Sequence, residues 1–137
     1  MKLLILHGPN MNLFGIRSSK EGKNITLDKI NRHIRRYIRD KNLETKIIQT
    51  HSEVKAVSYL HANRNNFDGL ILIPGAWQNC GYILKDTINI IECDYVTIQV
   101  TKSEGINLLP GTENIFNRGS FNYFWIALAN QSRTMDA

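Results

Sequence analysis

The stretch LLILHGPN at residues 3–10 contains an unbroken apolar run that ends at a histidine, a glycine and a proline. A short apolar run bounded by turn residues is typical of a strand that is buried on both faces of a sheet. A secretion signal also starts with a charged residue and an apolar run, but it continues to a cleavage site of small residues, which is missing here. We therefore expect residues 3–6 to form a buried first strand.

Strands and helices alternate along the sequence beyond this strand. The pattern predicts strands at 45–49, 69–73 and 95–100, a helix capped by Thr26 that runs to Arg39, and helices at about 52–65 and about 80–90. Residues 105–119 are expected to hold a short fifth strand, and residues 121–130 a closing helix. Strands that alternate with helices of this length require a parallel sheet covered on both faces. The predicted fold is α/β, a flavodoxin-like doubly wound parallel sheet in a three-layer αβα sandwich.

Length and composition indicate one globular domain spanning residues 1–137. The chain has 42% hydrophobic and 21% charged residues, and no segment approaches the roughly 20 apolar residues of a membrane-spanning helix. We therefore expect no membrane partner. The only cysteines, Cys80 and Cys93, do not form a C-x-x-C motif, so we expect reduced thiols and a cytoplasmic location.

A net charge of +5 raises the possibility of a nucleic-acid partner. Much of this charge lies in the predicted helix at 28–39, where apolar residues at helical spacing leave the basic residues on the opposite face. Such a pattern favours a solvated helix face over a nucleic-acid surface. Nucleic acid is accordingly the weakest hypothesis for a partner.

Ligands of doubly wound sheets bind at the carboxyl ends of the strands. The site is therefore expected in the segments that follow the strands, at residues 7–17, 49–53, 74–80 and 99–102.

Residues 7–17, HGPNMNLFGIR, are similar to the GPNxNxxGxR signature of type II 3-dehydroquinate dehydratases. Residues 49–53, QTHSE, with His61 after them, resemble the family's QSNxE and later histidine, and the PGA at 74–76 precedes three further matches at Tyr82, Leu84 and Asp86. The similarity runs from Lys2 to about Thr101. It implies a small-molecule substrate, no cofactor, and a homo-oligomer of trimers, possibly a dodecamer, in which Asp86 would reach a neighbour's site.

The resemblance also implies which positions carry the family reaction, an anti elimination of water through an enolate. Its base is a lid tyrosine that the signature arginine keeps reactive. Arg17 matches the arginine, but an ungapped count places Gly22 where the tyrosine belongs, and a shift of one residue would offer only Glu21. Its general acid is a histidine steadied by a glutamate, and these positions read Gln99 and Thr97. A positioned acid or base contributes about a hundred- to ten-thousandfold in rate. We therefore expect this chain not to dehydrate 3-dehydroquinate at a physiological rate.

Other matched positions are partly kept. Ile73, Asn79 and Ile106 replace substrate-holding residues of the family. By resemblance, the kept residues are Asn10, which would hold the water that steadies the enolate, Arg17, Asp86 and, conservatively, Thr101.

Two pairs of polar residues have both a functional and a structural interpretation. Asn10 and Asn12 can orient a ligand or close turns through their own side chains. His51 and Glu53 can form an acid/base pair, whereas Glu53 alone would complement a helix dipole. Arg17 is expected to anchor an anion on a glycine-containing loop.

The other singled-out residues follow the same division. Cys80, near a predicted helix start, is either a nucleophile or, as favoured here, an unreactive, half-buried thiol. Trp77 is either a stacking surface or a subunit contact. His7 is interpreted as a hydrogen-bonded structural histidine, and no metal site is expected because no second ligand lies at a recognisable spacing.

Four functions remain open from the sequence. The first is a repurposed enzyme that performs elimination, cyclisation or hydrolysis on a different small molecule. The others are a non-catalytic binding or assembly protein, a nucleic-acid binder, and residual dehydroquinate dehydratase activity. The catalytic candidates are Arg17, Asn10, His51 and Glu53. The substrate-binding candidates are Asn12, Asn79, Gln99, Thr101, Asp86, Trp77 and Cys80.

Overall fold

A five-stranded parallel sheet forms the centre of the molecule, with strand order β2-β1-β3-β4-β5. The computed structural model describes residues 2–20, 22–39, 41–99, 108–109 and 112–114. The strands are β1 (Lys2–His7), β2 (Glu44–Gln49), β3 (Gly69–Ile73), β4 (Tyr95–Gln99) and β5 (Thr112–Asn114). This order and the parallel pairing confirm the predicted flavodoxin-like sheet.

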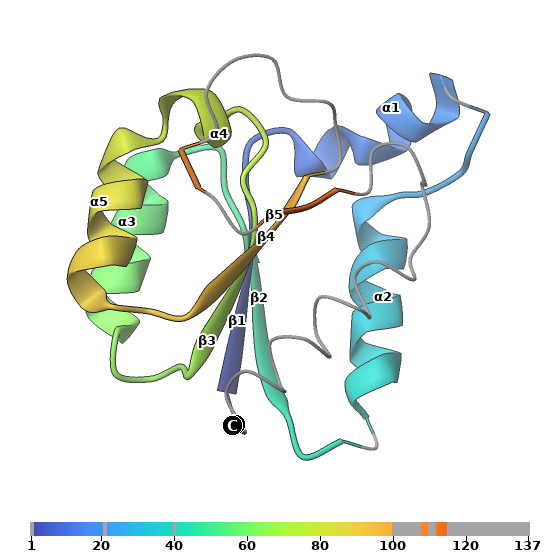
Figure 1. Ribbon diagram of the computed structural model, residues 1–137. Coiled ribbons are helices and arrows are strands. Elements are labelled where there is room, and N and C mark those ends of the chain that lie inside the picture. Colours follow the sequence, from blue (N-terminus) through green and yellow to red (C-terminus); the bar gives the residue numbers. More distant parts are fainter. Residues whose placement is uncertain (1, 21, 40, 100–107, 110–111, 115–137) are drawn as a thin grey trace.

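Helices cover both faces of the sheet, which gives three layers (Figure 1). They are η1 (Met11–Leu13), a 3₁₀ helix, followed by α1 (Phe14–Lys20), α2 (Leu27–Ile38), α3 (Glu53–Asn63), α4 (Trp77–Cys80) and α5 (Tyr82–Ile91). In Figure 1, α2 lies on one side of the sheet, while α3 and α5 lie together on the other. The short helix α1 projects beyond the end of the sheet at which the strands finish.

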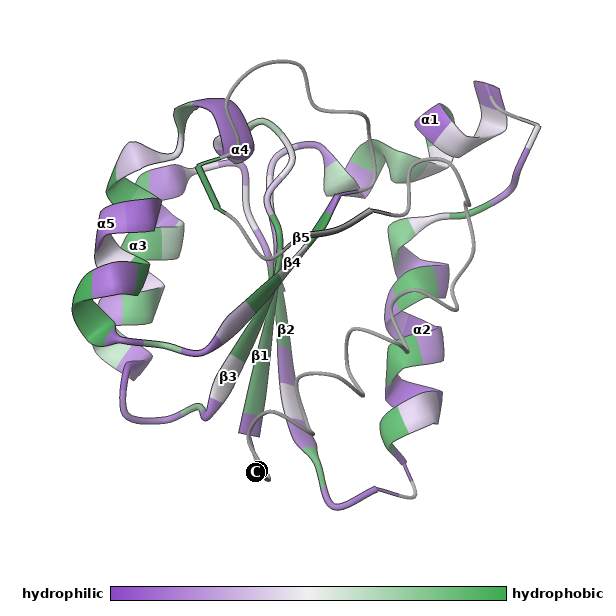
Figure 2. Cartoon of the chain, viewed as in Figure 1, coloured by the Kyte–Doolittle hydropathy of each residue, from purple (hydrophilic) through white to green (hydrophobic). Residues whose placement is uncertain are grey.

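The apolar run of β1 divides its side chains between two cores. Leu3 and Ile5 pack toward α2 in one cluster, whereas Leu4 and Leu6 pack toward α3 and α5 in the other. Successive side chains of a strand point to opposite faces, so a strand covered on both sides must be apolar throughout. Figure 2 shows strands that are largely hydrophobic between helices in which hydrophobic and hydrophilic residues alternate.

Two helices begin at the side-chain caps that their sequences provide. Thr26 Oγ1 accepts a hydrogen bond from the Lys29 N–H at 3.2 Å, as predicted for the start of α2. Ser52 Oγ accepts from the Lys55 N–H at 3.2 Å at the start of α3. Each cap satisfies a backbone donor that the first turn of a helix leaves without a partner.

The helix expected at about residues 80–90 corresponds to α5, and the short helix α4 before it was not predicted. Gly81 separates them, and a Cβ atom at this position would lie only 2.6 Å from the Trp77 carbonyl oxygen. The turn between the two helices thus requires glycine. A second difference is α1, a helix in a segment that was expected to be a loop.

The predicted fifth strand is confirmed by β5, within residues 105–119. The predicted closing helix at 121–130 lies outside the described residues. In the described part of the chain, no helix combines the length and apolar character that a membrane crossing requires.

Candidate active site

The segments that follow β1, β2 and β3 converge at the carboxyl edge of the sheet. The Gly8 N–H donates to the Ile73 carbonyl oxygen at 2.8 Å, and the Thr50 N–H donates to the His7 carbonyl oxygen at 3.0 Å. A Cβ atom on Gly8 would lie 2.7 Å from the Pro74 carbonyl oxygen, so this close approach requires glycine. Ligands of such sheets bind where neighbouring strands send their connections to opposite faces, which here is between β1 and β3.

Asn10 and His51 are brought together at this edge. Asn10 adopts a left-handed backbone conformation with φ of 66°, which asparagine tolerates better than most residues. In this conformation the Asn10 N–H donates to His51 Nδ1 at 3.1 Å. An accepting ring nitrogen carries no proton, so neutral His51 carries its proton on Nε2. Two of the predicted catalytic residues are therefore in contact, through the backbone of one and the ring of the other.

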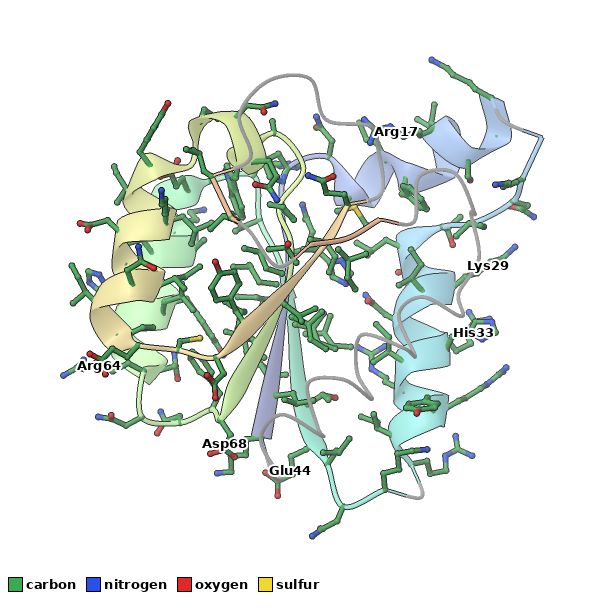
Figure 3. The ribbon with its side chains drawn as sticks, in the orientation of Figure 1. Arg17, Lys29, His33, Glu44, Arg64 and Asp68 are labelled. Atoms are coloured by element: carbon green, nitrogen blue, oxygen red, sulfur yellow. The ribbon has the colours of Figure 1, made fainter. Side chains whose placement is uncertain are left out.

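Arg17 lies on α1 rather than on the loop that the sequence suggested. The helix is fixed by Ser18, which is buried and whose Oγ donates to the Ile25 carbonyl oxygen at 2.8 Å and accepts from the Ile25 N–H at 3.0 Å. Figure 3 shows Arg17 at the end of the molecule opposite Glu44 and Asp68. The helix α1 thus carries the Arg17 guanidinium group at the carboxyl edge of the sheet.

An open groove of about 280 Å³ runs along η1 and α1. The described residues that line it are Asn10, Leu13, Ile16, Arg17 and Lys20. Among the described residues, the Arg17 guanidinium and the Lys20 ammonium have no hydrogen bond or ion pair. Two cations in one groove can receive an anion, and the guanidinium can bind a carboxylate or phosphate through two hydrogen bonds.

The end of β4 carries the amide of Gln99 at the position where the family resemblance calls for a histidine. Gln99 is buried, with 7% of its surface exposed, and Thr97 is also buried, with its Oγ1 donating to the Leu109 carbonyl oxygen at 3.3 Å. Gln78, which the sequence did not single out, accepts from the Leu109 N–H at 2.9 Å and donates to the Leu109 carbonyl oxygen at 3.0 Å. These bonds hold residue 109 against α4 beneath the site.

A family model covers most of the chain. The family model "Dehydroquinase class II" matches residues 1–105 of the chain. The chain belongs to the class II dehydroquinase family.

The relatives of this class II dehydroquinase family member include curated enzymes and solved structures. A 3-dehydroquinate dehydratase from Thermotoga neapolitana is 31% identical over 105 residues, covering 77% of this chain and 71% of the relative. Another, from Caldanaerobacter subterraneus, is 29% identical over 120 residues, covering 88% and 73% of the two chains. The type II dehydroquinase structure from Butyrivibrio crossotus superposes with a TM-score of 0.80 at 22% identity, covering 96% of this chain and 97% of that one. A 3-dehydroquinate dehydratase-like protein from Bifidobacterium longum gives a TM-score of 0.71 at 19% identity, covering 98% and 97% of the two chains.

The carboxylate of Glu53 is bound to a neighbouring helix. Its Oε1 accepts hydrogen bonds from the N–H groups of Ile83 and Leu84, at 3.1 and 3.2 Å. Glu53 therefore complements the first turn of α3, to which it belongs, and also caps the first turn of α5. No hydrogen bond joins Glu53 to His51 among the described residues, because each side chain is bound to backbone amides. An acid/base role for the two residues stays a prediction.

Two expectations about α4 are wrong. Trp77 is 3% exposed and packs in the core beneath α4 and α5, so its ring offers neither a stacking surface nor a subunit contact. Cys80 is the last residue of α4, two positions before α5 begins, and its side chain is exposed rather than half-buried. Its Sγ donates to the Ala76 carbonyl oxygen at 3.2 Å.

The remaining candidates occupy separate places. Asn12 is exposed on η1, Asn79 is exposed on α4, and Asp86 is exposed in the middle of α5. Thr101 lies outside the described residues. Within the described ranges, no three histidine, cysteine, aspartate or glutamate side chains gather closely enough to hold a metal ion.

His7 is a buried structural histidine, as predicted. Its Nε2 forms a hydrogen bond of 2.9 Å with Asn31 Oδ1 on α2, and burial lowers the pKa of its ring to about 4. Its Nδ1 has no hydrogen-bond partner in the part of the chain that the structure describes. The ring is therefore neutral at pH 7 and ties the end of β1 to α2.

Three residues of the groove were missed from the sequence. Leu13, Ile16 and Lys20 line it together with Asn10 and Arg17. Their positions repeat at helical spacing. This spacing would have placed them on one face with Arg17 if residues 14–20 had been predicted as a helix.

Proposed function

We propose that this class II dehydroquinase family member binds a small organic anion at the carboxyl edge of β1 and β3 and acts on it by chemistry other than the dehydration of 3-dehydroquinate. The reaction would be an elimination, cyclisation or hydrolysis on a different small molecule. Arg17 would hold the anionic group, and the Asn10 amide would orient the bound molecule.

One observation carries this proposal: the anion-binding side of the site is assembled, whereas its acid and base positions lack titratable groups. Arg17 and Asn10 line one groove. Gln99 lies at the end of β4, where the family resemblance calls for a histidine, and a neutral amide does not exchange protons near pH 7. Gly22, at the position of the family's tyrosine, has φ of 76° and nothing within 4 Å of a Cβ built on it.

Proton transfer to or from the bound molecule would then depend on a titratable side chain at another position. His51 is a titratable candidate at this edge, because its Nδ1 accepts from the Asn10 N–H and its Nε2–H is left to donate to a bound molecule.

The binding half of the proposal is tested with thermal shifts. Purified protein would be heated with a panel of carboxylate and phosphate metabolites, and with 3-dehydroquinate, and turnover of each stabilising compound would be followed by mass spectrometry. We expect Arg17→Ala to abolish the stabilisation. Arg35→Ala, which removes the same charge from the exposed face of α2, should not change it. Equal shifts in both variants, or the absence of any shift across the panel, would contradict the proposal.

A second candidate function is 3-dehydroquinate dehydration itself. It is favoured by the curated relatives, which at 29–31% identity are named 3-dehydroquinate dehydratases. It requires a proton donor and acceptor other than the residues at positions 22 and 99. The absorbance of the conjugated enone product distinguishes the two functions.

A further inference from the structure

The groove beside Arg17 has apolar walls as well as cations. Leu13 is 48% exposed and Ile16 is 58% exposed, and both line the groove together with Arg17 and Lys20. A single exposed leucine or isoleucine is ordinary in a folded protein. Two of them beside two cations that have no partner among the described residues make a surface with a defined chemical preference.

Helical spacing places these side chains in alternation. Residues 16, 17 and 20 follow residue 13 by three, four and seven positions, which is the spacing of one helix face. An apolar residue is thus adjacent to each cation. An anionic head group bound by Arg17 and Lys20 would bring the rest of its molecule against Leu13 and Ile16.

We infer that the ligand of this groove is an organic anion with a carboxylate or phosphate head and a hydrocarbon body, rather than a polyhydroxylated ring. This inference rests on the proposed anion site and names its substrate class. Hydroxyl groups placed against Leu13 and Ile16 would lose hydrogen bonds to water without gaining protein partners. A hydrocarbon body would instead remove apolar surface from water on both sides of the contact.

A matched ligand pair tests the inference by isothermal titration calorimetry. Cyclohexanecarboxylate and quinate share a six-membered carbon ring with one carboxylate, and quinate adds ring hydroxyls. We expect cyclohexanecarboxylate to bind wild-type protein at least about tenfold more tightly, with a negative heat-capacity change. Cyclohexyl phosphate distinguishes the two head groups: a Lys20-dependent gain over the carboxylate would identify a phosphate ligand.

Variants locate the preference on the groove. Ile16→Ser should weaken cyclohexanecarboxylate binding by about three- to tenfold, since a few buried methylene equivalents are lost, and should leave quinate binding unchanged. Ile90→Ser is the matched control, because Ile90 is 71% exposed on α5, away from the groove. Arg17→Ala should weaken every anion.

The outcomes separate this inference from the proposed function. Quinate that binds as tightly as cyclohexanecarboxylate, with both depending on Arg17, would overturn the hydrocarbon preference and leave the anion site in place. An equal loss of affinity for both ligands in Ile16→Ser would do the same. Absence of Arg17-dependent binding for all three anions would remove the anion site itself, and the preference with it.

Discussion

At the scale of single residues, His7 places an ionisable ring in the protein interior. Burial lowers its pKa from 6.5 to about 4, while the hydrogen bond with Asn31 acts in the opposite direction and is the smaller effect. The ring is neutral in the folded protein wherever the pH exceeds about 4. The unfolded chain, in contrast, takes up a proton on this residue below about pH 6.5.

We predict that the stability contributed by neutral His7 is fully present above pH 6.5 and is lost as the pH falls toward 4. The difference between a pKa of 6.5 in the unfolded chain and about 4 in the folded protein corresponds to a loss of about 3 kcal/mol in the free energy of unfolding across this pH window. Urea denaturation at pH 7 and at pH 4.5 measures it. His7→Asn should flatten the pH dependence, whereas His61→Asn, which changes an exposed histidine in the same way, should preserve it. An unchanged slope in His7→Asn would show that other groups cause the loss.

The residues at the site were only partly predictable. Arg17 and Asn10 could be placed near the end of the first strand, because a motif directly after a buried strand of a parallel sheet must lie at its carboxyl edge. The orientation of Trp77 could not be predicted, since it depends on the second core, which includes residues distant in sequence such as Leu6 and Leu60. The same limit applies to Glu53, whose partners are backbone groups of α5.

At the scale of elements, the capping of α5 by Glu53 links two helices through one carboxylate. The first N–H groups of α5 have no intrahelical acceptors, and Gly81 before them provides no side-chain cap. Glu53, from the first turn of α3, supplies the missing acceptor. The packing of α3 beside α5 therefore includes a polar contact between the first turns of the two helices, in addition to the apolar core.

Glu53→Ala is predicted to lower the free energy of unfolding by about 1–2 kcal/mol, because two amides at the start of α5 lose their acceptor. Glu53→Gln keeps an oxygen in the same position and should cost less than half as much. Chemical denaturation measures both. Glu44→Ala, which removes an exposed glutamate from β2, is the control. Equal costs at positions 53 and 44 would exclude the capping role.

The predicted strands agree with the structure more closely than the predicted helices do. Each buried strand is an apolar run with clear ends, so β1 to β4 were located within about two residues. The helix α4 was not predicted, because a four-residue helix is too short to show helical periodicity in the sequence. The helix α1 was missed for a different reason. Its position depends on Ser18 bonding to Ile25, a contact between segments that sequence patterns do not report.

At the scale of the whole molecule, the family fold is kept, whereas the resemblance predicts that the chemistry differs at two positions. The frame superposes on a type II dehydroquinase structure with a TM-score of 0.80. This frame brings Arg17 and Asn10 to one groove, yet the chain has Gly22 and Gln99 where the family resemblance calls for a tyrosine and a histidine. A fold positions functional groups but does not supply them, so membership of the family does not by itself fix the reaction.

The rate of conjugated-enone formation from 3-dehydroquinate by the wild-type protein is the measurement that addresses this difference most directly. A positioned acid and a positioned base each contribute about a hundred- to ten-thousandfold. Under matched conditions we therefore predict a rate at least about ten-thousandfold below that of a family member with both groups, such as the Thermotoga neapolitana relative. Enone formation at a rate comparable to that of the relative would contradict the account, because it would mean that another side chain of this protein performs both proton transfers.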